Sequence, residues 1–308
     1  MVDLTGHLEG IVERAHLLKT ERRSGARDAT LPGTNLGLIF EKPSTRTRTS
    51  FEVAINDLGG HAVVLSTKDL QLGRGETVAD TARVLSRYLD AVAYRAFRHA
   101  DVVELARHAS IPVINALDDR EHPCQIVGDL LTLRELWGHY PGHQLAYIGD
   151  GNNVCNSLLL GCAMVGIDFI AAIPAAYRPP EDLVAEARRR AADHGSSVEL
   201  VERPEEAAPG ADVLYTDVWV SMGDEAEAEA RTRAFQGYQI DARLLGEAKP
   251  GCRVMHDLPA HRGLEITDEV IDGPRSSVWD QAENRLHAQK ALLEYVLGPR
   301  GPRPRAST

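Results

Sequence analysis

Apolar runs of strand length alternate with helical patterns along most of this chain. In the first half, strands are expected at residues 36–40, 61–65, 91–94 and 111–115, and helices around 46–58, 76–88 and 100–108. In the second half, strands are expected near 144–148, 168–173, 197–201, 212–216 and 252–256, and helices near 154–165 and 180–194. Because parallel strands need long crossover connections, this alternation predicts α/β architecture, with parallel sheets covered by helices on both faces.

A helix expected near residues 123–138 separates the two sets of strands. A chain of 308 residues is long enough for two domains, each with its own core. We therefore expect two doubly wound parallel-sheet domains, residues 1–137 and 138–283. The functional motifs described below each follow an expected strand, which favours a site in the cleft between the domains. The basic, proline-rich tail at 299–308 is expected to be disordered.

The strongest local signal for chemistry lies between the first expected strand and the first expected helix. Residues 44–48 read Ser-Thr-Arg-Thr-Arg, so hydroxyls and guanidinium groups gather where the helix begins. Backbone N–H groups at a helix N-terminus have no intrahelical acceptor and attract anions. Arginine forks and hydroxyl donors suit a dianionic phosphate. An N-cap with solvated arginines is the alternative, but five consecutive donor residues favour a phosphate site.

Residues 41–48 (EKPSTRTR) resemble the carbamoyl-phosphate loop of the aspartate/ornithine carbamoyltransferase family, and residues 122–125 (HPCQ) match that family's second signature. Residues 217–223 (DVWVSMG) and 256–263 (HDLPAHRG) resemble its ornithine branch. The similarity extends from about residue 2 to about residue 298, with the motifs in the expected order. The resemblance implies transfer of a carbamoyl group from carbamoyl phosphate to an amine.

The resemblance also implies roles for particular residues. Phosphate would be bound by the loop, and Arg95 would bridge phosphate and the carbonyl oxygen. His122, Gln125 and Arg285 would hold the carbamoyl group. The complete expected carbamoyl-phosphate set is Ser44, Thr45, Arg46, Thr47, Gln71, Arg95, His122, Gln125, Leu258 and Arg285. Arg46, Arg95, His122 and Asp257 are expected to act in catalysis.

The same resemblance implies how the amine acceptor and a neighbouring chain take part. Asp217 would bind the acceptor's α-ammonium group, Asn153 would contact its α-carboxylate, and Ser221 and Met222 would complete the pocket. Gln71 lies in a loop that the family extends into a neighbouring subunit's site, which implies a homotrimer or a multiple of it. A free surface loop is the alternative at Gln71. The final helix, residues 284–298, is expected to pack back on the first domain.

Asp257 departs from the family pattern, because the ornithine branch carries cysteine at this position. An aspartate is normally a full anion at pH 7, whereas a thiol is mostly neutral. Asp257 could accept a proton from the attacking amine, hold the ammonium too firmly, or recognise a different acceptor. It could also be a neutral change. If it lies close to Asp217, like-charge repulsion will raise the pKa of one carboxylate and favour a role as a base.

A dinucleotide-binding loop is the competing interpretation of residues 149–153 (GDGNN), which also follow a strand and precede a helix. The third glycine of a G-x-G-x-x-G pattern is missing, since Val154 or Cys155 takes its place. Asp168 stands before its strand rather than after it, so a convincing ribose-binding carboxylate is also missing. A nicotinamide-dependent dehydrogenase is therefore disfavoured.

Composition limits the possible partners. The formal net charge of −11 argues against nucleic acid or an anionic membrane surface. No apolar stretch approaches 18 residues, and the first residues lack the basic start and hydrophobic core of a signal peptide. The four cysteines have no paired spacing for a metal and are expected to be reduced thiols. We expect a cytoplasmic enzyme with small-molecule substrates, no cofactor and no metal.

The expected reaction converts carbamoyl phosphate and L-ornithine to L-citrulline and phosphate. Two alternatives remain open at the level of sequence. One is a carbamoyltransferase for another diamino acid or diamine, and the other is a catalytically weak paralogue that binds carbamoyl phosphate.

Overall fold

The computed structural model describes residues 1–26, 29–66, 75–221 and 225–298. The chain forms two compact units. One contains Glu9–Leu131 and Asn284–Thr308, and the other contains Met1–Leu8 and Thr132–Glu283. The divisions near residues 131 and 283 fall inside the helices α5 (Pro123–Trp137) and α12 (Val278–Leu297).

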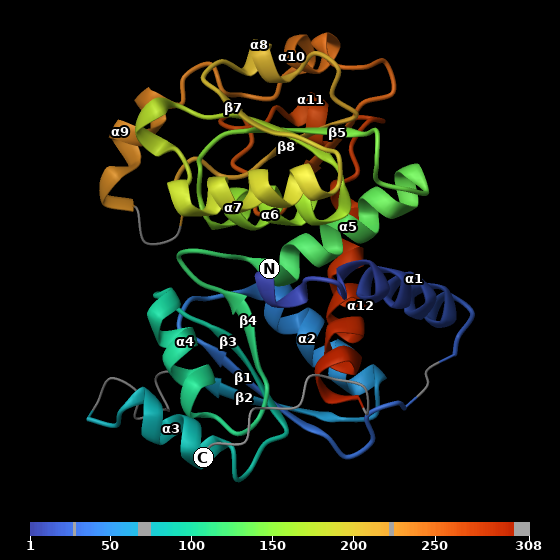
Figure 1. The fold of residues 1–308 in the computed structure, drawn as a ribbon, viewed down its shortest axis with the longest axis vertical. Helices are drawn as coiled ribbons and strands as arrows, with labels where there is room; N and C mark the ends of the chain where they lie inside the picture. The colour runs from blue at the N-terminus through green and yellow to red at the C-terminus, as the bar shows by residue number, and fades with distance from the viewer. Residues whose placement is uncertain (27–28, 67–74, 222–224, 299–308) are drawn as a thin grey trace. The chain divides into compact units, whose positions relative to one another are not determined.

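The unit that begins at Glu9 is built on a sheet of four parallel strands in the order β2-β1-β3-β4 (Figure 1). These strands are β1 (Asn35–Phe40), β2 (His61–Ser66), β3 (Ala91–Arg95) and β4 (Val113–Leu117). After β2 the chain returns to the other side of β1, so the strand order reverses between β1 and β3. Open parallel sheets bind ligands beyond the carboxyl ends of their strands at such a reversal.

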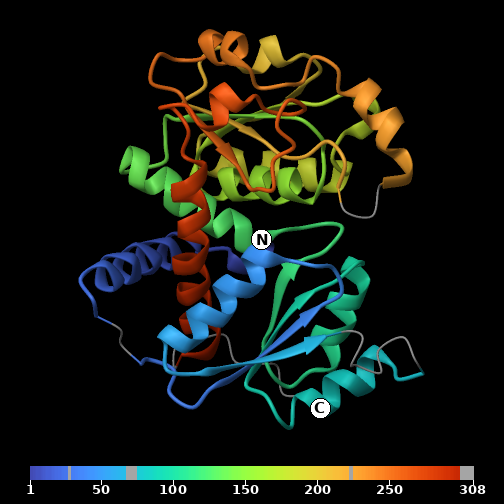
Figure 2. The ribbon, with the colours of Figure 1, turned by 180° about the vertical axis from the view of Figure 1, so that it is seen from behind.

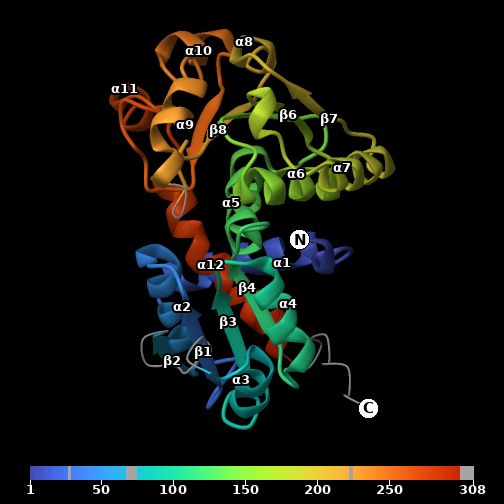
Figure 3. The ribbon, with the colours of Figure 1, turned by 90° about the vertical axis from the view of Figure 1, so that its left-hand side faces the viewer.

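Helices cover both faces of this sheet. They are α1 (Leu8–Arg23), α2 (Thr45–Asp57), α3 (Val78–Leu85) and α4 (His99–His108), together with the parts of α5 and α12 that belong to this unit. Ala82 of α3 and Leu105 of α4 pack on Ile39, Val92 and Tyr94 of the sheet. Helix α2 lies on the opposite face from α4 (Figure 3).

The long helices of this unit are joined by charged contacts on the α2 side of the sheet. Arg14 of α1 donates to Glu294 of α12 at 2.6 Å, and the buried Lys19 ammonium donates to Asn284 at 2.7 Å. Lys290 lies 3.5 Å from Asp57 at the end of α2. The last helix is thereby attached to helices from the first third of the chain (Figure 2).

The other unit is built on five parallel strands in the order β7-β6-β5-β8-β9. These strands are β5 (Gln144–Ile148), β6 (Asp168–Ala172), β7 (Val198–Val201), β8 (Val213–Thr216) and β9 (Arg253–His256). The strand order reverses between β5 and β8. The loops that follow β5, β8 and β9 therefore leave the same edge of the sheet.

Two helix layers cover this second sheet, with α6 and α7 on one face and α8, α10 and α11 on the other (Figure 1). The helices are α6 (Asn153–Val165), α7 (Glu181–Asp193), α8 (Pro204–Ala207), α9 (Ala228–Ala234), α10 (Ala242–Glu247) and α11 (Asp268–Ile271); the short 3-10 helices are η1 (Val2–Leu4), η2 (Ala175–Tyr177) and η3 (Glu225–Glu227). Helix α6 is buried along nearly its whole length, which explains its run of apolar residues. Among the described residues, no helix has the length and hydropathy needed to span a membrane.

The predicted fold class, two parallel α/β domains, is confirmed. Two local expectations were wrong, and one long helix was missed. Strand β4 lies two residues later than expected; Pro112, just before it, has no N–H to donate to a sheet. Helix α12 begins at Val278 rather than 284, after a turn in which the Ser276 hydroxyl accepts Val278 N–H. The first helix, α1, was not predicted.

Candidate active site

The loop after β1 and the first turn of α2 form the expected anion site. Ser44 is the N-cap residue of α2, and its hydroxyl accepts the amide N–H of Thr47 at 3.3 Å. Accepting that bond leaves the Ser44 O–H able to donate to another group. Thr45 and Arg46 are the first two residues of the helix. Hydroxyls, amides and a guanidinium therefore gather at the end of the helix where the dipole favours negative charge.

Arg285 of α12 connects this helix end to α5. One terminal nitrogen of its guanidinium donates to Thr47 Oγ1 at 2.9 Å, and the other donates to Gln125 Oε1. Gln125 in turn donates to Asp129 at 2.9 Å. Gly128 allows this approach, because a Cβ atom there would lie 3.2 Å from Arg285 Cδ. The network is almost fully buried, so its hydrogen bonds hold Arg285 and Gln125 in one arrangement.

His122 and Arg95 are buried in the same unit, with exposed fractions of 4% and 5%. Burial lowers the pKa of His122 well below its usual value, and the positive charges of Arg285, Arg95 and Arg46 lower it further. The four predicted basic residues are thus near enough for the three guanidinium charges to act on His122. A neutral imidazole can donate one hydrogen bond to a carbonyl oxygen without adding charge to the cluster.

Glu41 fixes the ends of β1 and β3 relative to each other. Its carboxylate accepts the Tyr94 hydroxyl at 2.7 Å and the Phe97 amide at 2.6 Å. The Glu41 amide donates to the Arg95 carbonyl at 2.9 Å. The backbone on both sides of Arg95 is therefore tied to the loop that leads to α2, a connection that sequence reasoning did not identify.

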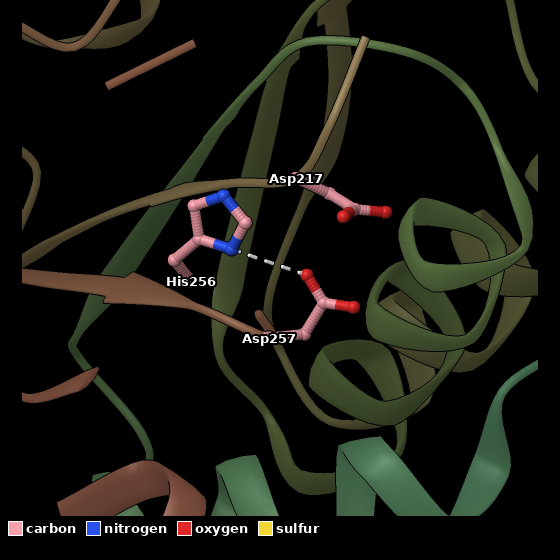
Figure 4. A group of neighbouring side chains, drawn as sticks. All are labelled: Asp217, His256 and Asp257. Carbon is pink, nitrogen blue, oxygen red and sulfur yellow. Dashed lines mark ion pairs between the residues drawn. The ribbon is translucent and has the colours of Figure 1, made fainter. Parts of the chain in front are cut away.

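In the other unit, Asp217 and Asp257 follow the neighbouring strands β8 and β9, and their carboxylates lie close to the ring of His256 (Figure 4). Asp217 is 5% exposed and accepts the Asn152 side-chain amide and the Val218 N–H, each at 2.7 Å. Burial raises the pKa of Asp217 well above its usual value, and the adjacent Asp257 carboxylate raises it further. The two carboxylates therefore lie close together, which is the condition under which the sequence led us to expect a raised pKa.

His256 is held behind Asp257 by two further contacts. Its Nδ1 accepts the Leu258 N–H at 2.9 Å, and its Nε2 lies 3.1 Å from the fully buried carboxylate of Glu265. Burial lowers the pKa of His256, but Asp257 and Glu265 together outweigh it and raise the pKa to about 9. A proton on Nδ1 would face the Leu258 N–H, so protonation requires that hydrogen bond to break. When the ring is neutral, its proton lies on Nε2 and faces Glu265, because Nδ1 accepts the Leu258 N–H.

Comparison with known proteins identifies this arrangement. The family model described as the carbamoyl-P binding domain of aspartate/ornithine carbamoyltransferase matches residues 2–135, and the Asp/Orn binding domain model matches residues 141–296. The chain belongs to the aspartate/ornithine carbamoyltransferase family. An ornithine carbamoyltransferase of Methanoculleus marisnigri is 57% identical over 290 residues, 94% of this chain and 93% of that protein.

Solved structures of the family agree with the fold. Ornithine carbamoyltransferase from Pyrococcus furiosus has a TM-score of 0.92 and 52% identity, with 95% of this chain and 93% of that chain covered. The enzyme from Gloeobacter violaceus has a TM-score of 0.84 and 49% identity, with 94% of each chain covered.

Two predicted residues of this family member lie outside the described part of the chain, Gln71 and Met222. Ser221 is half-buried at the edge of the described segment. Asn153 is the first residue of α6, and its neighbour Asn152 is the residue whose side chain donates to Asp217. Asn152 also caps α6 by accepting the amides of Val154 and Cys155 at 3.0 and 3.1 Å.

Sequence reasoning missed a second anchor of the loop after β5. Arg231 of α9 donates to Asp150 at 2.7 Å and to the Trp219 carbonyl at 3.3 Å, and its guanidinium lies 5.0 Å from the centre of the Tyr177 ring. An arginine eighty residues away in sequence gives no local signal of this pairing. The loops after β5 and β8 are therefore joined twice, by Asn152 and by Arg231.

A metal ion would have one candidate position among the described residues. One potential ligand atom from each of Asp217, His256 and Asp257 lies within 4.8 Å of the others. However, both ring nitrogens of His256 already have partners, Leu258 N–H and Glu265. A ligating histidine must offer a nitrogen lone pair. The arrangement is therefore suited to protons and cationic amines, and it fits a metal ion poorly.

Proposed function

We propose that this protein transfers the carbamoyl group of carbamoyl phosphate to the side-chain amine of L-ornithine, giving L-citrulline and inorganic phosphate. The observation that carries the proposal is the buried, neutral His122 imidazole, whose pKa is lowered in part by the guanidinium groups of Arg46, Arg95 and Arg285. It lies in the part of the chain that matches the carbamoyl-P binding domain model. The relatives named ornithine carbamoyltransferase support ornithine as the acceptor.

Three functions would be divided among the carbamoyl-phosphate residues. Ser44, Thr45, Arg46 and Thr47 would neutralise the phosphate, and Arg95 would reach both the phosphate and the carbonyl oxygen. His122 would donate to that oxygen as it gains negative charge, since a donor aimed at a developing oxyanion lowers the barrier. Gln125 and Arg285 would hold the carbamoyl amide. Leu258 and a neighbouring chain's Gln71 belong to this set through the family resemblance.

The acceptor would bind to the other domain. Asp217 would accept the α-ammonium group in a charge-assisted hydrogen bond, and Asn153 would donate to the α-carboxylate. Ser221 and Met222 would complete the pocket. The hydrogen bond from Asn152 supports this role for Asp217, because it fixes one carboxylate oxygen and leaves further lone pairs for the ligand.

The chemical step requires an uncharged amine. The nitrogen lone pair attacks the carbonyl carbon, and the tetrahedral intermediate then breaks its bond to the phosphate oxygen and releases phosphate. The amine is an ammonium group with a pKa of about 10 in water, so a proton must leave it first. Asp257 would accept that proton. Its position beside Asp217 and His256 supports this role, since crowded acidic groups bind a proton more strongly than an isolated carboxylate.

A second acceptor class is favoured by the same pair of carboxylates. Two adjacent acidic groups would also suit another diamino acid, or a diamine, which carries two ammonium groups and no α-carboxylate. A non-catalytic carbamoyl-phosphate-binding paralogue has less support, because Arg46, Arg95, His122, Gln125 and Arg285 are all present. A protein that only bound a partner would not need all five.

The remaining proposals concern organisation. We propose that residues 1–137 with the helix at 284–298 bind carbamoyl phosphate, that 138–283 bind the acceptor, and that the reaction takes place between these domains. We propose a homotrimer, or a multiple of it, in the cytoplasm, with no cofactor. Val63 and Val64 of the edge strand β2 support an assembly, because they are 37% and 38% exposed and lie just before the segment that contains Gln71.

The test is steady-state turnover with carbamoyl phosphate and a panel of amines, read by a colorimetric assay for the ureido product. The panel should contain L-ornithine, L-lysine, 2,4-diaminobutyrate, putrescine and L-aspartate. The highest kcat/KM with ornithine supports the first proposal, and the highest value with a diamine supports the second. No ureido product with any amine would contradict carbamoyl transfer itself.

A further inference from the structure

Asp118 is a fully buried carboxylate just after β4 that the proposed mechanism does not use. It accepts the backbone N–H groups of Arg120 and Glu121 at 2.8 and 2.7 Å and the side-chain amide of Asn115 at 2.8 Å. The two backbone groups bond to Oδ1, whereas Oδ2, which accepts the Asn115 amide, also lies 2.7 Å from His99 Nδ1. Burying a carboxylate costs free energy unless its lone pairs accept hydrogen bonds. The hydrogen bonds to both oxygens of Asp118 offset that cost.

The residue before Asp118 has a strained backbone. Leu117 has a φ of 151°, a conformation that residues with side chains rarely adopt. The Asn115 side chain accepts Leu117 N–H at 3.0 Å, and the Leu117 carbonyl accepts Ala96 N–H at 2.9 Å. Such strain persists only where surrounding contacts enforce it, and it is common at functional sites. Here the enforcing contacts also hold the backbone directly after Arg95.

The residues after Asp118 lead directly to His122. The Asp118 N–H donates to the Glu121 carbonyl at 3.0 Å, which closes a turn that ends one residue before His122. The thiol of Cys124, in the first turn of α5, donates to the Asn115 carbonyl at 3.3 Å. Asp118 and Asn115 are therefore bonded to the turn before α5 and to its first turn, and α5 carries Gln125, which contacts Arg285.

We infer that Asp118 is a positioning residue for the carbamoyl end of carbamoyl phosphate, acting through the 118–121 turn on His122 and Gln125. This inference rests on the proposed function of those two residues. The phosphate end is held by the N-terminus of α2, which receives none of the Asp118 hydrogen bonds described above. Loss of Asp118 should therefore affect recognition of the carbamoyl group and leave recognition of phosphate unchanged.

The test compares two probes in calorimetric titrations of the full chain. Inorganic phosphate reports the phosphate end alone, and phosphonoacetamide, a non-reacting analogue, adds a carboxamide. Asp118→Asn keeps the size of the side chain but replaces one carboxylate oxygen with an NH₂ donor. That donor would face either the side-chain NH₂ of Asn115 or the backbone N–H groups of Arg120 and Glu121. We expect it to weaken phosphonoacetamide binding by roughly 10- to 100-fold, as a misplaced contact does, with phosphate binding unchanged.

The control and a second variant separate positioning from a general loss of structure. Asp119→Asn removes a charge at the next, exposed position and should change neither affinity. His99→Ala removes one of the four Asp118 partners named above. It should also weaken binding of phosphonoacetamide and not of phosphate, by a smaller factor, and it provides a test even if Asp118→Asn does not fold. In turnover, Asp118→Asn should raise KM for carbamoyl phosphate and lower kcat, with KM for ornithine unchanged.

Two results would overturn the inference. Equal weakening of both probes would assign Asp118 a structural role only, and unchanged phosphonoacetamide binding in Asp118→Asn and His99→Ala would assign it no role at the site. A wild-type protein that binds phosphate but binds phosphonoacetamide no better would contradict the proposed function as well, and the two failures are therefore distinguishable.

Discussion

Asp217 and Asp257 lie at the ends of neighbouring parallel strands, and their carboxylates, with the ring of His256, offer ligand atoms within 4.8 Å of one another. Two acidic groups at this separation cannot both ionise without a large electrostatic cost when they are buried. An ammonium group placed between them would remove that cost. The pair is therefore complementary to a cationic amine.

The first prediction concerns the stability cost of this pair. The folded pKa of Asp217 is raised above its usual value of 3.8, so the cost is absent below that pH and grows as pH rises through the folded pKa. Asp257→Asn removes one charge and can donate to Asp217. We expect this variant to have a higher free energy of unfolding at neutral and alkaline pH, where each added kcal/mol raises Tm by roughly 2–4 °C. Near pH 4 we expect little change in Tm.

Thermal melts of both proteins across this pH range would measure the difference. Asp268→Asn is a suitable control, because its side chain is 75% exposed and pairs only with the surface residue Arg262 among the ion pairs described. A difference in Tm between Asp257→Asn and wild type that does not grow with pH would contradict like-charge repulsion at this site.

The second prediction concerns His122, whose folded pKa is lowered well below 6.5. In the unfolded chain the ring takes up a proton as pH falls through about 6.5, whereas the folded protein resists it. The contribution of His122 to the free energy of unfolding of the wild-type protein is thus present above pH 6.5, and it is lost as pH falls below 6.5. His122→Gln should flatten the fall in unfolding free energy on the acid side, measured by denaturant titration at several pH values. An equally steep fall in the variant would assign the acid sensitivity to other groups.

Arg46 provides the third prediction. Arg46→Ala removes a charged donor at the N-terminus of α2, and charge-assisted hydrogen bonds contribute about 1.5–3 kcal/mol. We expect kcat/KM for carbamoyl phosphate to fall by roughly 10- to 150-fold with the fold intact by circular dichroism. Arg48→Ala is the matched control, since the exposed Arg48 pairs with Glu52 at 2.7 Å on the same helix. Near-normal saturation by carbamoyl phosphate in Arg46→Ala would refute the phosphate site.

Assembly is the subject of the fourth prediction. Light scattering during gel filtration should give a mass of three chains, or a multiple of three. Val64→Glu should lower that mass, because it places a charge on an exposed apolar position of the edge strand β2. Gln71→Ala should lower activity more than it lowers Tm. A fully active monomer would contradict a site shared between chains.

The sequence predicted the fold class because that class depends on regular features, and it left the distance between Asp217 and Asp257 open. Strand and helix periodicities are local, and motifs that follow parallel strands meet at one sheet edge. It did not predict the partners of Asp118 or the pairing of Arg231 with Asp150. These contacts join residues from different elements, and the choice among many polar side chains is made by tertiary packing. The helix α1 was missed because its apolar residues are interrupted by charged ones that contact other helices.

The fifth prediction addresses the acceptor itself. Asp257→Cys replaces an anion with a mostly neutral thiol and restores the residue that the family resemblance leads us to expect. If ornithine is the natural acceptor, turnover with ornithine should be kept or raised. If the aspartate serves another cationic acceptor, the variant should gain preference for ornithine from a poor starting value. In a partly dry site, the interaction of a carboxylate with an ammonium group is several kcal/mol stronger than that of a thiol. This difference is enough to change specificity by orders of magnitude.

The measurement is the ratio of kcat/KM for ornithine to that for shorter and longer diamines in both proteins. If that ratio is the same in both proteins, Asp257 does not select the acceptor, and its proximity to Asp217 then affects only protonation and stability.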